Sequence, residues 1–143
     1  MNYWLIKSEP DTYSFEDLRR DRKTAWDGVR NYQARNNLAA MKKGDVCLVY
    51  HSGPNPGIVG TAKVVKTAYA DPNAEDPRWV NVDVQAGTAL AHPVGLAALK
   101  KHPLLSQMAV VRQGRLSVSP VKEEEWTAIM ALAGTSGGSS AGG

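Results

Sequence analysis

Polar and flat aromatic side chains gather in three short stretches of the sequence. Residues 7–10 (KSEP) end an apolar segment in a proline turn, residues 26–36 (WDGVRNYQARN) open a helix pattern, and residues 50–53 (YHSG) carry a second apolar segment into a polar end. Aromatic rings stack on the face of a nucleobase while amides and hydroxyls read its edge. A helix that begins at Asn31 also offers free N–H groups to a phosphate. These residue types together favour a pocket for a nucleobase.

The sequence lacks the short motifs of several enzyme classes. It contains no GxSxG, no phosphate-binding loop, no dinucleotide glycine fingerprint and no HExxH. Cys47 and His51 have the residue types of a nucleophile and its base, but a spacing of four along one strand separates them by about 13 Å. A buried structural thiol is therefore the preferred interpretation. We expect no catalysis; in the alternative, an enzyme acting on a modified base or nucleotide, Glu9 or His51 is the acid or base.

Composition excludes several further classes of protein. One Cys among 143 residues rules out an internal disulfide framework, and three scattered His do not suggest a metal cluster. The longest apolar runs are far shorter than the ~20 residues of a membrane helix, and the start of the chain lacks the apolar stretch of a signal peptide. We expect one domain with no metal, no cofactor and no membrane contact, in a cytoplasmic setting.

The charge distribution is more basic than the net charge indicates. Lys and Arg number 17 against 14 Asp and Glu, but three of the acids are Glu123–Glu125, where the dipole of a final helix favours them. Before Glu123 the balance is 17 basic against 11 acidic side chains, an excess of +6. Such a surface can hold a polyanion, although cations at helix C-termini explain some groups equally well. The basic residues gather at Arg19, Arg20, Arg22 and Lys23, at Arg30 and Arg35, and at Lys42 and Lys43.

Alternation and apolar runs predict the strands that must position these residues. Strands are expected over residues 2–8, 45–52, 57–67 and 79–85, with a bulge or a close backbone approach at Gly60. Val80, Val82 and Val84 would face inward and Asn81 and Asp83 outward. Residues 108–112 and 115–121 are expected to pair as a hairpin around Gln113–Gly114.

Capping residues predict shorter helices between the strands. Ser14 would cap a helix over residues 15–20, with Asp17 completing a capping box, and Asn31 would cap a helix that ends at Met41. A short helix is expected between residues 93 and 101, and a last one over residues 122–133 that buries Trp126. Trp4 and Trp126 fit core positions. Trp26, in contrast, precedes Asp27–Gly28 and is expected in a loop facing a ligand.

These elements predict an α+β domain. Strands outnumber helices and no βαβ rhythm appears, so a small curved sheet or barrel with peripheral helices is favoured. The domain would span residues 1–133. Residues 134–143 contain only Gly, Ser, Ala and Thr and are expected to form a flexible tail.

Five motifs in order along residues 2–133 resemble one known family. The chain is similar to the EVE domain, a member of the PUA-like group related to the YTH readers of methylated adenine. The matching segments are YWLIKSEPDTYSFEDL, WDGVRNYQARNNLAAMKKGD, YHSGPNPGIVG, PRWVNVDV and RLSVSPV with its following EEEW. The resemblance implies a PUA-like small bent β-barrel of about five to six strands with peripheral helices.

The resemblance also implies a function and a site. EVE domains look like non-catalytic readers of a modified base in DNA or RNA, with cytosine modifications favoured, so nucleic acid is the implied partner. The alternative outside catalysis is a protein-interaction module with a vestigial pocket, favoured if Trp26 is buried with no concavity beside Arg35 and His51. The residues carried over as the base- and nucleic-acid-binding site are Ser8, Glu9, Trp26, Arg30, Asn31, Tyr32, Arg35, Tyr50, His51, Ser52, Trp79, Arg115 and Ser117.

One segment departs from the family pattern. Relatives commonly carry a longer Pro- and Asp-rich loop between the segments that match Asp71–Pro72 and Pro77–Trp79, whereas here only Asn73 to Asp76 intervene. If that loop closes the pocket in the family, the site of this chain is more open.

Overall fold

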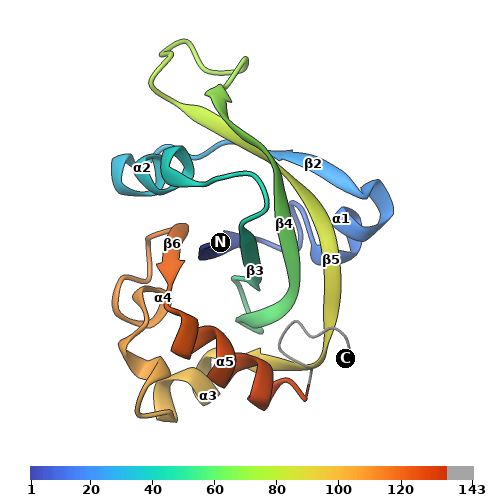
Figure 1. Ribbon diagram of the computed structural model, residues 1–143, viewed down its shortest axis with the longest axis vertical. Helices are drawn as coiled ribbons and strands as arrows, with labels where there is room; N and C mark the ends of the chain where they lie inside the picture. Colours follow the sequence, from blue (N-terminus) through green and yellow to red (C-terminus); the bar gives the residue numbers. More distant parts are fainter. Residues whose placement is uncertain (135–143) are drawn as a thin grey trace.

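Six strands form one mixed, strongly curved sheet in the order β2-β5-β4-β3-β1-β6 (Figure 1). The computed structural model describes residues 1–134, so the segment predicted as a flexible tail, residues 134–143, lies outside the described residues except for Gly134. β1 runs parallel to β3, and the other neighbours pair antiparallel. The strands are β1 (Tyr3–Ser8), β2 (Lys23–Trp26), β3 (Val46–His51), β4 (Gly57–Ala70), β5 (Val80–Gly95) and β6 (Val118–Val121).

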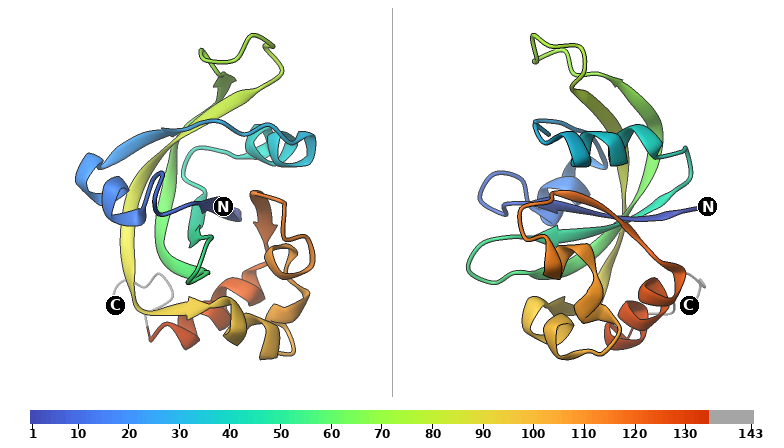
Figure 2. Two further views of the ribbon diagram at one scale, coloured as in Figure 1. Left: turned by 180° about the vertical axis from the view of Figure 1, so that it is seen from behind. Right: turned by 90° about the vertical axis from the view of Figure 1, so that its left-hand side faces the viewer.

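Five α-helices and one 3-10 helix surround the sheet within residues 1–134. α3, η1, α4 and α5 gather at one end of the molecule, while α1 and α2 lie on opposite sides of the strands (Figures 1 and 2). No helix in this part of the chain is long and apolar enough to cross a membrane. The helices are α1 (Phe15–Asp21), α2 (Tyr32–Ala40), α3 (Leu96–Lys101), η1 (Leu105–Gln107), α4 (Ala109–Arg112) and α5 (Glu123–Leu132).

The α+β class is confirmed, but the sheet does not close into a barrel. Its edge strands, β2 and β6, pair with β5 and β1 and not with each other. Helix α2 contacts both β5 and β6 and so lies in the space that a closing pair would need. Asn37 of α2 donates a hydrogen bond of 2.7 Å to the carbonyl of Val118, which satisfies part of the β6 edge. Helix α2 therefore lies where β2 and β6 would have to pair to close a barrel.

Both faces of the central strands are buried, in two separate apolar clusters. Trp4 and Ile6 of β1 point into one cluster with Cys47, while Leu5 points into the other with Leu48. This alternation follows from the period of two in a strand. Trp4 and Trp126, each 6% exposed, take the core positions expected of them.

The local capping chemistry predicted from the sequence is present. The Asp17 N–H donates to Ser14 Oγ at 3.0 Å and the Ser14 N–H donates to Asp17 Oδ2 at 2.9 Å, which completes the capping box of α1. The Ala34 N–H donates to Asn31 Oδ1 at 2.9 Å at the start of α2. Both caps satisfy helix N–H groups that would otherwise lack partners.

One of the predicted strands is wrong, and another is longer than expected. Residues 108–112 form the end of η1 and helix α4 instead of a hairpin strand, because Val110 is buried in the second cluster and the local N–H groups bond to carbonyls within the turn. The strand expected over 79–85 is present but continues to Gly95, and the short helix expected between residues 93 and 101 is present as Leu96–Lys101. Pro93 fits in β5 because β2 pairs only as far as Gln85, which leaves that side of the strand without a ladder partner.

Gly60 meets the expectation of a bulge with a close approach. The register of β4 against β5 shifts on both sides of Gly60, and the buried ring of Phe15 packs directly on its Cα. A Cβ at this position would overlap the ring. The glycine therefore lets α1 dock against the sheet.

We predict that Gly60→Ala lowers the free energy of unfolding by about 1–3 kcal/mol, because a fixed ring cannot yield to the added methyl group. Gly95→Ala is the matched control, since its added Cβ would have Pro56 O at 3.8 Å as its nearest neighbour. Urea unfolding of both variants measures the difference. Equal unfolding free energies would contradict the packing assigned to Gly60.

Candidate functional site

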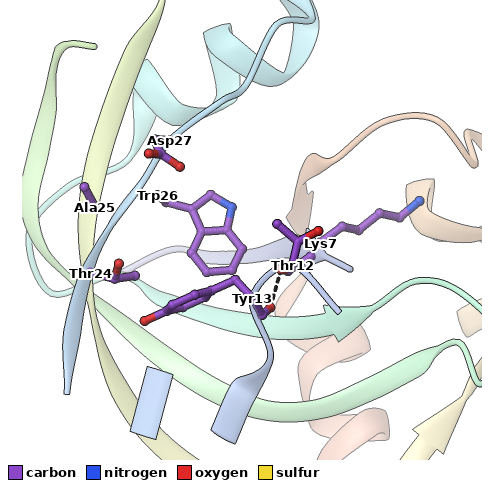
Figure 3. A pocket seen from close by; sticks show the side chains of 8 residues that line it. Lys7, Thr12, Tyr13, Thr24, Ala25, Trp26 and Asp27 are labelled. Atoms are coloured by element: carbon purple, nitrogen blue, oxygen red, sulfur yellow. Dashed lines mark hydrogen bonds between the residues drawn. The ribbon is translucent and has the colours of Figure 1, made fainter. Parts of the chain in front are cut away.

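A cavity of about 360 Å³ opens between the end of β1, the turn that follows it and the end of β2 (Figure 3). Its walls combine two aromatic rings with hydroxyls, one ammonium and one carboxylate. The lining residues are Lys7, Ser8, Thr12, Tyr13, Thr24, Ala25, Trp26 and Asp27.

Trp26 forms the aromatic wall of the cavity and is also part of the core. It ends β2 opposite Val82 and is 7% exposed, and its ring forms a T-shaped pair with that of Tyr13, with centroids 6.4 Å apart at 82°. The expectation of a loop position was wrong, because Lys23 to Trp26 pair with β5. The indole N–H forms no hydrogen bond within residues 1–134, and it is not fully buried. In Figure 3 it lies on the side of the ring facing Thr12, so it is accessible to a molecule in the cavity.

A tight turn holds the opposite wall. The N–H groups of Thr12 and Tyr13 donate to the Glu9 carbonyl at 2.9 and 2.8 Å, and Ser8 Oγ donates to the Tyr13 carbonyl. Tyr13 donates its hydroxyl to Asp21 Oδ2 at 2.8 Å, and burial raises the pKa of this phenol above its ordinary value. These contacts fix the ring before any ligand enters.

Lys7 links the cavity to the loop before β6. Its Nζ donates to the Gly114 carbonyl at 2.6 Å and lies 5.5 Å from the centre of the Tyr50 ring. Burial lowers the pKa of this ammonium group. The backbone N–H of Lys7 donates to the Ser117 carbonyl at 2.9 Å, which places Ser117 beside the strand that lines the cavity.

The buried carboxylate of Asp71 holds the segment that follows Trp26. It accepts hydrogen bonds from the Asn73 N–H at 2.9 Å, from the Arg30 guanidinium at 3.2 Å and from the Gly28 N–H. The hydrogen bond from Asn73, together with those from Arg30 and Gly28, holds the pKa of Asp71 below its usual range despite burial. Gly28 has φ of 76°, a left-handed conformation that suits glycine. Asp71 thereby sets the path of the chain from Trp26 to Asn31.

An exposed stack of aromatic and arginine side chains lies along the same segment. Tyr32 stacks on Trp79 with centroids 4.9 Å apart, the Arg78 guanidinium lies 5.6 Å from the Tyr32 ring, and that of Arg30 lies 5.8 Å from the Trp79 ring. Arg35 donates from Nε to the Arg78 carbonyl at 2.8 Å. We call Arg30, Tyr32, Arg35, Arg78 and Trp79 the arginine–aromatic surface. The shortened loop before Pro77 is therefore fixed to the start of α2.

The structure divides the residues expected in the site into several groups. Ser8 and Trp26 line the cavity. Arg30, Tyr32, Arg35 and Trp79 belong to the arginine–aromatic surface, and Asn31 caps the helix beneath it. Glu9 and Arg115 are exposed and do not line the cavity, while Ser52 contacts Ser8 through its backbone N–H at 3.0 Å.

Tyr50 and His51 have structural contacts away from the cavity. Tyr50 is 3% exposed within the second apolar cluster. His51 accepts a 2.9 Å hydrogen bond from the Phe15 N–H at Nε2, and burial lowers its pKa, which favours the neutral imidazole that this bond requires. Cys47 is fully buried and its pKa is raised to about 12 by burial, in agreement with a structural thiol.

Six of the eight residues that line the cavity were not among those expected in the site: Lys7, Thr12, Tyr13, Thr24, Ala25 and Asp27. Thr12 and Tyr13 lie within the first matching motif and Asp27 within the second, so their signal was present but was not separated from neighbouring residues. Thr24 and Ala25 belong to β2, whose four residues carry too short a pattern to predict a strand. Residues 1–134 hold no group of three His, Cys, Asp or Glu side chains placed to bind a metal ion.

Comparison with known proteins identifies close relatives. A family model described as the EVE domain matches residues 2–132. Thymocyte nuclear protein 1 of Mus musculus is 41% identical over 166 residues, covering 92% of this chain and 73% of that protein. The crystal structure of human THYN1 protein in complex with 5-methylcytosine containing DNA has a TM-score of 0.87 at 35% identity, covering 95% of this chain and 99% of that chain. An ASCH protein from Zymomonas mobilis, at 12% identity and a TM-score of 0.60 over 92% of this chain and 95% of that chain, shares the fold alone.

These comparisons confirm the resemblance carried by the sequence motifs and correct one expectation. The relatives from mouse, human and rat are named nuclear proteins. The cytoplasmic setting expected from the sequence is therefore wrong. It rested on general features of composition, which do not distinguish one compartment from another within the cell.

We predict that Asp71→Asn lowers the free energy of unfolding at pH 7 by roughly 1–3 kcal/mol, because the amide cannot accept all the bonds made by the carboxylate. Since folding lowers the pKa of Asp71, its contribution is complete above the unfolded pKa of about 4 and is lost as the pH falls through the folded value. The deficit of the variant should therefore be constant above about pH 5 and shrink at lower pH.

Urea unfolding at stepwise lower pH measures this deficit. The control is Asp76→Asn, which changes a half-buried carboxylate of the same loop that pairs with exposed Arg78, and it should lower the free energy of unfolding less because water can replace this partner. A deficit at pH 7 no larger than that of the control would contradict the role assigned to Asp71.

Proposed function

The chain belongs to the EVE domain family, and from this premise we propose that it binds nucleic acid and reads a modified base, with a modified cytosine in DNA as the preferred ligand. The human relative solved with 5-methylcytosine containing DNA supports both the partner and the base. The observation that carries the proposal in this chain is the cavity walled by Trp26 and Tyr13.

The dimensions and chemistry of the cavity suit one base. Its volume of about 360 Å³ is at the small end of ligand sites, which suits a single ring system better than a stretch of strand. An aromatic side chain stacked on a base contributes about 1–3 kcal/mol. The accessible indole N–H and the hydroxyl of Thr12 supply hydrogen-bonding groups for the base edge. A base that enters must leave its own stack, as in other base-flipping proteins.

The arginine–aromatic surface is placed to contact the strand beside that base. Asp27 to Val29 join it to the cavity wall, so a nucleotide next to the bound base would lie near Arg30 and Tyr32. Guanidinium groups bind phosphates and exposed rings stack on unpaired bases. The basic excess before Glu123 supports such contacts over a longer stretch.

We propose that residues 1–133 act as one PUA-like EVE domain, followed by a Gly- and Ser-rich tail. The match over residues 2–132 and the fold shared with the ASCH protein support this division. We also propose that the chain binds the modified base without catalysing a reaction on it. Of the two acid–base candidates, Glu9 is exposed outside the cavity lining and His51 uses Nε2 to accept from Phe15, so neither is poised over a bound base.

Filling the cavity should remove the preference for the modified base. Trp26 is too buried to truncate safely, whereas Thr12 is exposed at the cavity mouth. We predict that wild-type protein binds a DNA duplex with one 5-methylcytosine more tightly than the same unmodified duplex, and that Thr12→Trp brings both to one affinity. Thr12→Ser is the matched control and should keep the preference.

Fluorescence polarisation with labelled duplexes gives the six affinities, and circular dichroism verifies the fold of each variant. Binding through phosphates alone persists in Thr12→Trp and weakens as salt rises. Equal affinity of the wild type for both duplexes, or an unchanged preference in Thr12→Trp, would overturn the proposed function.

A further inference from the structure

Asp27 is the one acidic side chain that lines the cavity. It is exposed, and within residues 1–134 its carboxylate forms no hydrogen bond and no ion pair. In Figure 3 the carboxylate lies beside the indole of Trp26, at the edge of the cavity. The site therefore presents a strong hydrogen-bond acceptor that the fold itself does not use.

Four carboxylates in the segments around the cavity are occupied, whereas Glu9 and Asp11 of the opposite turn are exposed and lie outside the cavity lining. Asp71 holds Arg30 and two N–H groups, Asp76 pairs with Arg78, Asp21 bonds to Tyr13 and Arg20, and Asp83 accepts from Tyr69. Each of these acids is explained by a contact that stabilises its own segment. Asp27 has no such explanation.

The position of Asp27 is fixed by its neighbours in the chain. Trp26 on one side is paired in the sheet opposite Val82. Gly28 on the other side is held in a left-handed conformation, with its N–H bonded to buried Asp71. The backbone of Asp27 is therefore held at a set place beside Trp26, and only the torsions of its own short side chain remain to be ordered when it meets a ligand.

A carboxylate in this position lowers the affinity of the cavity for DNA. A polyanionic ligand is repelled by negative charge, and the other charged side chain of the cavity, Lys7, directs its ammonium to the Gly114 carbonyl. A charge that weakens general attraction to DNA yet remains in the cavity is suited to selecting among bases.

The edges of the pyrimidines differ in the atom that such a group would meet. Cytosine carries an amino group at C4, which donates, while thymine and uracil carry a carbonyl there, which accepts. An ionised carboxylate can only accept. It would bond to the amino group of cytosine and repel the carbonyl oxygen of thymine.

We propose that Asp27 accepts a hydrogen bond from the exocyclic amino group of the bound base, and that it makes the cavity select cytosines over thymine and uracil. The indole N–H of Trp26 is then available to donate to an acceptor on the same base. This role of Asp27 rests on the proposed function and identifies the residue that selects the class of base that the cavity binds.

Thymine and 5-methylcytosine form the matched ligand pair for the test, because both carry the C5 methyl group and they differ at C4 and in the protonation of N3. Each is placed in a DNA duplex opposite an abasic site, which removes the difference in pairing partner, and a cytosine duplex is the third ligand. The proteins are the wild type, Asp27→Asn and Asp76→Asn. Asp76→Asn makes the same change of charge on the neighbouring loop and is the control.

The wild type is expected to prefer 5-methylcytosine to thymine by about tenfold or more, in the range of a charged hydrogen bond gained or lost. Asp27→Asn should bring this ratio to within about twofold, because an amide can also donate to the thymine carbonyl. Asp76→Asn should keep the ratio. Comparing ratios removes any general gain in DNA affinity from the lost negative charge.

The outcomes separate the two proposals. A wild type that prefers 5-methylcytosine to cytosine but binds thymine equally well overturns the role of Asp27 and leaves the proposed function standing. So does an Asp27→Asn protein that retains the wild-type ratio. A wild type that distinguishes none of the three duplexes overturns the proposed function itself.

Discussion

The buried carboxylate of Asp71 is the interaction on which the candidate site depends. Removing a carboxylate from water is costly unless it is paired and hydrogen-bonded, and Asp71 is compensated by Arg30 and by the N–H groups of Gly28 and Asn73. These partners come from the two segments that flank the site. One buried charge therefore ties the loop after β2 to the loop between β4 and β5, and both the cavity wall and the arginine–aromatic surface take their positions from it.

Trp26 is both a core residue and part of the cavity wall. Its ring is packed in the larger apolar cluster and is 7% exposed, as a core residue would be. It also lines the cavity with an accessible N–H group. A rigid wall of this kind suits stacking, because no side-chain freedom is lost when a base arrives. The recognition of small differences between bases then falls to the polar groups at the rim, among which Asp27 is the unpaired acid.

Local chemistry was predictable from the sequence and long-range contacts were not. Ser14 with Asp17, and Asn31 with Ala34, form caps that depend on residues three apart, so the motifs alone indicate them. The strand Lys23–Trp26 exists because it pairs with residues 56 to 62 positions away, which no local pattern encodes. His51 was assigned to the site from its place after a strand, but its Nε2 accepts from Phe15, 36 residues earlier. The open sheet has the same origin, since helix α2 lies where a barrel would close.

The indole N–H signals of the four tryptophans test the account most directly. In a two-dimensional NMR titration with DNA containing one 5-methylcytosine, the Trp26 signal should shift far more than with unmodified DNA. The signals of Trp4, whose N–H donates to Asp45 at 2.9 Å, and of Trp126, stacked on Tyr3, should stay in place. A Trp26 signal that does not move, or that moves equally with both DNAs, would contradict the reading of a base in this cavity.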